Sequence, residues 1–346
     1  MPEHPGIDDE GGALWHPWLW QITLGAVLLA LAIWQVNFHG LGDAFANASY
    51  GWLLLAMGVY IISRIVHAYE WRITLTKVGA PPAAGLFGAL LIGTLVNSVV
   101  PASAGDIVKI QIVANRYRLP RAGLAAGRGA EAVVDAAIMV VFILISFALP
   151  GVGFAPADLL WLLAAGTAVL FAAAVAGSRL MPAVMPRWRV LARLPHAVAG
   201  GVERYWPRVH DGLEVIRRPR LLAIAILLNL FGWGVDLLIL WAYGQTFHLH
   251  IPLAAYLSVT VVVAMLTTFP ITFGNIGTYE VALLSVLALY AVPADAALAF
   301  AAGTHVITTA FNVALGLLAM AAMGIRPGEV FRVRAPGGGV KGDGQA

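Results

Sequence analysis

Long apolar runs separated by short polar stretches dominate the chain. Such runs cover residues 18–38, 50–69, 158–177, 221–243 and 294–323, and residues 121–149 form another, in which Arg128, Glu131 and Asp135 are embedded. Because about 20 apolar residues cross the hydrocarbon core of a bilayer as a helix, each run predicts a transmembrane helix. The pattern therefore predicts an all-α polytopic membrane protein with about six full transmembrane helices.

Proline and glycine break two further apolar stretches. The first break follows residues 84–100 and reads Pro-Ala-Ser-Ala-Gly-Asp over 101–106; the second follows residues 252–269 and reads Pro-Ile-Thr-Phe-Gly-Asn-Ile-Gly-Thr-Tyr-Glu over 270–280. Non-helical backbone persists inside a bilayer only where protein or trapped water satisfies its free amides and carbonyls. Each break therefore predicts a re-entrant helical hairpin. Paired interruptions in the two halves of a membrane protein point to a transport site.

The positions of lysine and arginine support hairpins over full crossings. A full crossing by residues 84–118 would place Arg116, Arg118 and Arg121 across the membrane from Lys77, against the tendency of basic residues to collect on the cytoplasmic side. If residues 84–118 and 252–291 each return to the side they entered, the basic clusters all share one side. We therefore expect the first hairpin to enter from the cytoplasm, the second to enter from outside, and both termini to be cytoplasmic.

The two breaks then face each other as the halves of an inverted repeat do. Each half contains a break, a short returning helix, a proline-led turn and a long apolar run. Residues 119–124 (Leu-Pro-Arg-Ala-Gly-Leu) resemble residues 292–297 (Val-Pro-Ala-Asp-Ala-Ala). The pattern predicts an inverted-repeat arrangement; a chance likeness between alanine-rich helices is the alternative.

The polar segments divide the chain into three parts. We expect a polar tail over residues 1–16, an integral membrane domain over 17–325 and a disordered, basic cytoplasmic tail over 326–346. Within the domain, residues 179–220 form an arginine-rich cytoplasmic loop. Apolar residues recur there every three or four positions from Val198 to Ile216, which predicts an interfacial helix kinked at Pro207 on the anionic inner leaflet. A basic loop that only fixes the topology is the alternative.

The amino-acid composition excludes several classes of protein and several kinds of reactive site. Hydrophobic residues make up 60% of the chain and charged residues 11%, whereas soluble domains carry about 25% charged residues. Cysteine is absent, which excludes disulfides, thiol nucleophiles and Cys-ligated metal. P-loop, Gly-x-Ser-x-Gly and His-Glu-x-x-His motifs are also absent. We therefore expect no enzyme activity, no catalytic residues, no cofactor and no metal.

Charged residues near the first break are the first candidates for a binding site. Arg128, Glu131 and Asp135 share one helical face, and Asp106 and Lys109 follow the break. A buried charge costs several kcal/mol unless it is paired. These residues therefore form either structural ion pairs or a polar wall for a headgroup, with Arg128 or Lys109 facing a phosphate. Asp106 is alternatively a simple helix cap.

Polar residues in the second half are the other candidates. Glu280 follows the second break, where a new helix N-terminus favours anions; a first-turn acid is the alternative. His305 aligns with Glu131 in the repeat and either packs or acts directly. We expect Asp236 to pair with His305 or Arg128, and Arg64 to reach the headgroups from near its helix end. Interhelical hydrogen bonds are expected from Asn97, Asn229 and Asn312.

These motifs resemble the transmembrane region of lysylphosphatidylglycerol synthases, a flippase-like membrane family. The family's first motif, Pro, Gly, acid and base, is similar to Pro101, Gly105, Asp106 and Lys109, and its second is similar to Pro270, Gly274, Gly277 and Glu280. A Glu-Arg-x-x-Asp patch falls on Glu131, Ala132 and Asp135, with Arg128 as the substitute for the expected arginine. His305 stands where an arginine is common.

The resemblance implies two re-entrant hairpins around a lipid-headgroup cavity formed by these motif residues. The expected function is translocation of a polar or anionic lipid, such as an aminoacyl-phospholipid, a glycolipid or a hopanoid-related lipid, across the bacterial inner membrane. Expected partners are membrane lipids, a second copy in a homodimer and lipid-biosynthesis enzymes, but not nucleic acid. Because only a short stretch follows the last apolar run, we expect no aminoacyl-transfer domain. A membrane scaffold and an intramembrane lipid-modifying enzyme are the alternatives.

Overall fold

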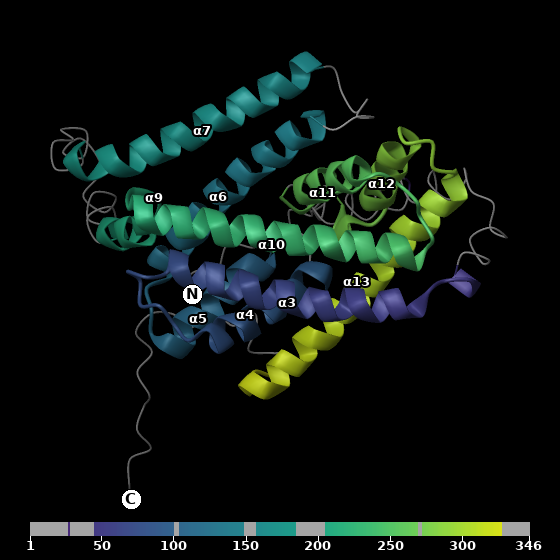
Figure 1. The fold of residues 1–346 in the computed structure, drawn as a ribbon. Helices are drawn as coiled ribbons and strands as arrows, with labels where there is room; N and C mark the ends of the chain where they lie inside the picture. The colour runs from purple at the N-terminus through teal and green to yellow at the C-terminus, as the bar shows by residue number, and fades with distance from the viewer. Residues whose placement is uncertain are drawn as a thin grey trace, which may run out of the picture.

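A computed structural model describes residues 27, 45–99, 104–148, 157–184, 205–268 and 272–326, and all regular structure in these ranges is helical. The predicted first helix, apart from Val27, and Pro101 and Pro270 lie outside the described residues. The described helices include one at each predicted apolar run after the first, and α3 and α7 extend beyond the predicted ends. The elements are (Figure 1) α3 (Tyr50–Thr74), α4 (Ala83–Val99), α5 (Ala104–Tyr117), α6 (Arg121–Ala148), α7 (Ala157–Val184), α9 (Glu214–Arg217), α10 (Pro219–Thr246), α11 (Leu253–Thr268), η3 (Phe273–Asn275), α12 (Thr278–Ala288) and α13 (Ala294–Met323).

Helices α3 and α10 run side by side through the middle of the molecule (Figure 1). The N-terminal end of α3 meets the C-terminal end of α10, where the Ser49 N–H donates to the Thr246 carbonyl at 2.9 Å. The two helices are therefore antiparallel. The N-terminal end of α3 and the C-terminal end of α10 lie at one end of the molecule, and the C-terminal end of α3 and the N-terminal end of α10 lie at the other.

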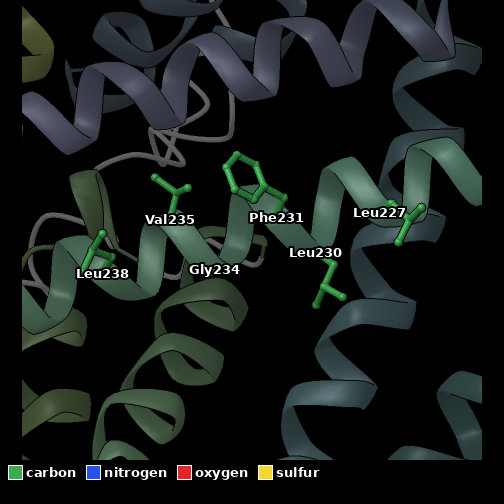
Figure 2. A pocket seen from close by; sticks show the side chains of 6 residues that line it. All are labelled: Leu227, Leu230, Phe231, Gly234, Val235 and Leu238. Atoms are coloured by element: carbon green, nitrogen blue, oxygen red, sulfur yellow. The ribbon is translucent and has the colours of Figure 1, made fainter.

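Three of the described helices, α3, α10 and α13, are long and apolar enough to cross a membrane, by length and composition. Six residues of α10 line a shallow apolar pocket on one side of the helix (Figure 2). Among them, Leu227 is 65% exposed and Phe231 is 59% exposed. Helices α6 and α7 each have 28 residues. They lie together, with α7 on the outside of the molecule (Figure 1).

Helices α4 and α5 form the first hairpin and pack along each other. They approach so closely that a Cβ on Gly105 would overlap the carbonyl oxygen of Gly93. The Gly105 N–H, at the start of α5, donates to Asn97 Oδ1 at 2.7 Å. At the other end of the hairpin, the Tyr117 hydroxyl lies against Gly85. The hairpin thus begins and ends at the same end of the molecule.

Basic residues gather at this end. Gly79 lies against Leu119, and the Arg116 guanidinium donates to the Met323 carbonyl at the end of α13 at 3.2 Å. These contacts place the residues next to Lys77 and those next to Arg118 at the same end of the molecule. The distribution of lysine and arginine along the sequence predicts this arrangement.

Helices α11 and α12 form the second hairpin at the opposite end. The hydroxyl groups of Ser258 near the start of α11 and Tyr290 just after α12 lie 2.9 Å apart. The tips of the two hairpins meet inside the molecule, because a Cβ on Gly274 in η3 would lie 3.5 Å from the Ser98 carbonyl oxygen near the end of α4.

The predicted interfacial helix is only partly described, and its interruption falls at another residue than the predicted kink at Pro207. Residues 205–212 are helical through Pro207, and the interruption falls at Leu213. A Cβ on Gly212 would overlap the carbonyl of Gly123 in α6. Val215 and Ile216 in α9 are each 1% exposed. This segment therefore packs against α6 and α10.

The close contact between Gly93 and Gly105 allows a prediction about the stability of the fold. Gly105→Ala places a methyl group on a backbone carbonyl, so we expect the free energy of unfolding to fall by about 1–3 kcal/mol. Gly58→Ala in α3 is the matched control, since no atom lies within 4 Å of the added Cβ. Thermal unfolding in detergent measures both. A Gly105→Ala protein as stable as the control would contradict the close packing.

Candidate functional site

An ion-pair cluster joins α5 and α6. It consists of Asp106, Lys109, Arg128, Glu131 and Asp135. Lys109 Nζ lies 2.7 Å from Asp106 Oδ1, and Arg128 Nε lies 3.8 Å from the same oxygen. Arg128 Nη1 lies 3.5 Å from Glu131 Oε2 and 3.4 Å from Asp135 Oδ2. One guanidinium is therefore shared by three carboxylates.

Helix geometry explains why Arg128 occupies this position. Arg128, Glu131 and Asp135 are spaced by three and four residues, which places them on one face of α6. Ala132, where the resemblance expects an arginine, is exposed and lies away from this face. Among the described residues of this face, Arg128 is the one that brings a guanidinium to Glu131 and Asp135.

Helices α3 and α10 extend the ion-pair cluster. Asn229 Nδ2 on α10 donates to Asp135 Oδ1 at 2.8 Å and also to Glu70 on α3. The Trp233 indole N–H donates to Asp135 Oδ1 at 3.3 Å. Lys109 Nζ lies 5.3 Å from the ring centroid of Trp71, so its ammonium sits between a carboxylate and an aromatic face.

The ion-pair cluster has an excess of negative charge and is accessible to solvent. Three carboxylates, those of Asp106, Glu131 and Asp135, surround the two cations Lys109 and Arg128. The side chains of Asp106 and Arg128 are 34% and 29% exposed. Glu131 Oε2 is buried and has no hydrogen-bond donor among the described residues.

A histidine bridge joins α3 to α10. His67 Nδ1 lies 3.0 Å from Glu70 Oε2, and His67 Nε2 lies 3.1 Å from Asp236 Oδ2. Arg64 Nη2 lies 3.2 Å from Asp236 Oδ1. A Cβ on Gly232 would lie 3.0 Å from the His67 ring, so this glycine makes room for the imidazole.

The histidine bridge corrects three expectations. Asp236 pairs with Arg64 and His67, not with His305 or Arg128. Arg64 binds this carboxylate instead of reaching toward headgroups, because its face of α3 packs on α10. Glu70 lies just beyond the predicted helix over residues 50–69, but it belongs to α3 and is 1% exposed. Sequence reasoning did not single out His67, although its spacing of three from Glu70 was the available signal.

A break cluster forms around the second interruption and consists of Gly274, Gly277, Glu280 and His305. Glu280 Oε2 accepts the Gly277 N–H at 2.7 Å, which caps α12. Glu280 Oε1 lies 2.6 Å from His305 Nδ1, and His305 Nε2 lies 3.0 Å from the Gly274 carbonyl oxygen. Gly274 and Gly277 have φ values of 57° and 80°, which glycine adopts without steric cost.

The structure thus sorts the predicted site residues into two groups on different helices. Asp106, Lys109, Arg128, Glu131 and Asp135 share the ion-pair cluster, whereas Gly274, Gly277, Glu280 and His305 share the break cluster. Gly105 serves the packing of α4 on α5. His305 contacts Glu280 rather than Glu131, its counterpart in the repeat.

The predicted roles of the asparagines are confirmed. Asn97 links α4 to α5, and Asn229 links α10 to both α3 and α6. Asn312 in α13 accepts a hydrogen bond from the Tyr60 hydroxyl in α3. All three side chains join different helices.

The histidine bridge makes a second stability prediction. Asp236→Asn keeps the side-chain shape but leaves Arg64 and His67 without their carboxylate, and breaking a buried ion pair costs about 3–5 kcal/mol. We expect a large loss of thermal stability in detergent. Asp211→Asn, at a side chain that is 55% exposed, should change little. Equal effects of the two substitutions would show that the histidine bridge contributes no stability.

Comparison with known proteins is consistent with this geometry. The family described as lysylphosphatidylglycerol synthase TM region matches residues 18–316. The match includes both hairpins, the ion-pair cluster and the break cluster. No curated protein and no solved structure matches the chain. The family match covers most of the sequence, and the chain therefore belongs to the lysylphosphatidylglycerol synthase TM region family.

Proposed function

We propose that this protein moves lipids with polar headgroups from one leaflet of the membrane to the other. The family is one of membrane proteins related to lipid modification or transport. The observation that carries the proposal is the meeting of two oppositely directed hairpin tips, at Gly274 and Ser98, inside a predominantly apolar chain. A headgroup can cross apolar surroundings only where polar groups line its route.

Helix lengths support re-entrant hairpins. Helix α4 has 17 residues and α12 has 11, which correspond to about 25 Å and 17 Å. Both are shorter than a hydrocarbon core of about 30 Å. Each hairpin begins and ends at one end of the molecule. We therefore propose that both hairpins enter the bilayer and return, from opposite sides, as an inverted repeat.

The charge distribution supports an orientation. The end of the molecule that carries Lys77, Arg116, Arg118 and Arg121 also carries the basic segment over 205–220. Basic residues collect on the cytoplasmic side of membrane proteins. We propose that this end faces the cytoplasm of a bacterial cell, with the protein in the inner membrane and both termini inside.

The ion-pair cluster is the proposed headgroup site. Arg128 offers a guanidinium suited to phosphate, and Lys109 lies beside it through Asp106. The excess of carboxylates favours a headgroup that carries a cationic group near its phosphate, as an aminoacyl-phospholipid does. Glycolipids and hopanoid-related lipids are the other proposed substrates. No covalent bond forms or breaks in this process, so the proposal is transport and not catalysis.

Reconstituted vesicles test the headgroup site. We expect the protein to speed the exposure of a fluorescent aminoacyl-phospholipid to an impermeant quencher. Lys109→Met should slow this exposure about tenfold, since a charge-assisted hydrogen bond contributes about 1.5–3 kcal/mol. Lys77→Met removes the same charge from an exposed position and is the matched control.

Two results would contradict the proposal. Headgroup exposure that is no faster with the protein than without it would exclude translocation under these conditions. Retained activity of Lys109→Met in cells, together with loss of activity when the arginines of residues 205–220 are neutralised, would favour the scaffold alternative.

A further inference from the structure

His305 presents both ring nitrogens to oxygen acceptors. Nε2 lies 3.0 Å from the Gly274 carbonyl oxygen, and Nδ1 lies 2.6 Å from Glu280 Oε1. A backbone carbonyl accepts hydrogen bonds and carries no proton, so Nε2 must be the donor in the first contact. In a neutral imidazole, Nδ1 would then be left with a lone pair.

The contact at Nδ1 therefore requires another proton. The second oxygen of Glu280 already accepts the Gly277 N–H at 2.7 Å, so Oε1 is the oxygen that faces the ring. A lone pair and an ionised carboxylate oxygen would repel each other at this distance. A proton must lie between them, either on the ring as imidazolium or on Glu280 as a carboxylic acid.

We infer that Glu280 and His305 form a binding site for a coupling proton, and that this proton holds the tip of the second hairpin in place. The inference rests on the proposed function and adds its energy source. Proton binding is the only chemical step, and no bond between heavy atoms changes. Histidine suits this role because it is the side chain that exchanges protons near neutral pH.

Among the described residues around Glu280, His305 is the one cationic or titratable side chain that pairs with it. The Glu280 side chain is 5% exposed and that of His305 is 17% exposed, so the pair is buried yet within reach of water. Among the described residues no lysine or arginine pairs with Glu280. The Tyr279 ring lies 4.8 Å from the imidazole, and Tyr243 on α10 bonds Thr308 of α13. Residues 83–99 of α4 contain no ionisable side chain.

Loss of the proton has a mechanical consequence. His305 on α13 holds α12 through Glu280 and η3 through the Gly274 carbonyl. Without the proton, the contact at Nδ1 becomes repulsive and Glu280 is left as a buried, unpaired anion, which is unfavourable. The pair then separates and releases η3. Because Gly274 lies against Ser98, the two hairpin tips part, which opens the proposed route.

The absence of cysteine in the chain allows a direct test. Spin labels are attached at neutral pH to Ser98→Cys near the end of α4 and Ile276→Cys, an exposed position beside Gly274. Dipolar broadening is then recorded from pH 5 to pH 9 in lipid nanodiscs. We expect strong broadening at acidic pH and loss of most of it at alkaline pH.

Variants at His305 provide the controls. His305→Arg keeps a permanent cation beside Glu280, so broadening should persist at every pH. His305→Gln cannot hold the proton, so its broadening should be weak and independent of pH. Gel filtration of each labelled variant shows that it is folded. Broadening in the His305 parent that does not change with pH, or the same pH dependence in His305→Arg, would overturn the inference.

Measuring lipid translocation in vesicles alongside the broadening distinguishes a failure of the proton site from a failure of the proposed function. If no lipid moves in vesicles but the broadening depends on pH only when His305 is present, the proton site stands and the proposed function fails. If lipid moves at the same rate from pH 5 to pH 9 and the broadening is constant, translocation stands and the proton site is wrong.

Discussion

Acidic side chains inside the described part of this protein lie beside cationic or hydrogen-bonding groups of the protein, because an unpaired charge in apolar surroundings is costly. This constraint determines which helices are neighbours. Arg128 ties α6 to α5, Arg64 ties α3 to α10, and His305 ties α13 to α12. Six acidic residues depend on such pairs: Glu70, Asp106, Glu131, Asp135, Asp236 and Glu280.

The same constraint governs the broken backbone at both hairpins. Side chains satisfy one described amide at each break, Asn97 that of Gly105 and Glu280 that of Gly277. Glu280 therefore has two tasks, since one oxygen caps α12 and the other contacts His305. Glu280, which caps the N-terminus of α12, thus also helps to hold the tip of the second hairpin through His305. Structure and proposed function thus depend on the same side chains.

Much of the fold could be predicted from the sequence, because apolar runs and charge asymmetry are local signals. The helix bounds, both breaks and the shared face of Arg128 and Glu131 follow from spacing alone. The partner of Asp236 could not be predicted, because apolar residues lie on every side of α10 and their pattern does not show which side faces α3. His67 and Glu70 were missed for the same reason, since only the packing of two helices shows that they are buried.

The central claim is that two half-crossing hairpins meet from opposite sides of the membrane. Single cysteines introduced at Lys77, Arg118, Leu253 and Leu289 in the cysteine-free chain can be labelled with an impermeant thiol reagent in oriented membrane vesicles. The account predicts that Lys77→Cys and Arg118→Cys react from one side and that Leu253→Cys and Leu289→Cys react from the other. Labelling of Lys77→Cys and Arg118→Cys from different sides would contradict it.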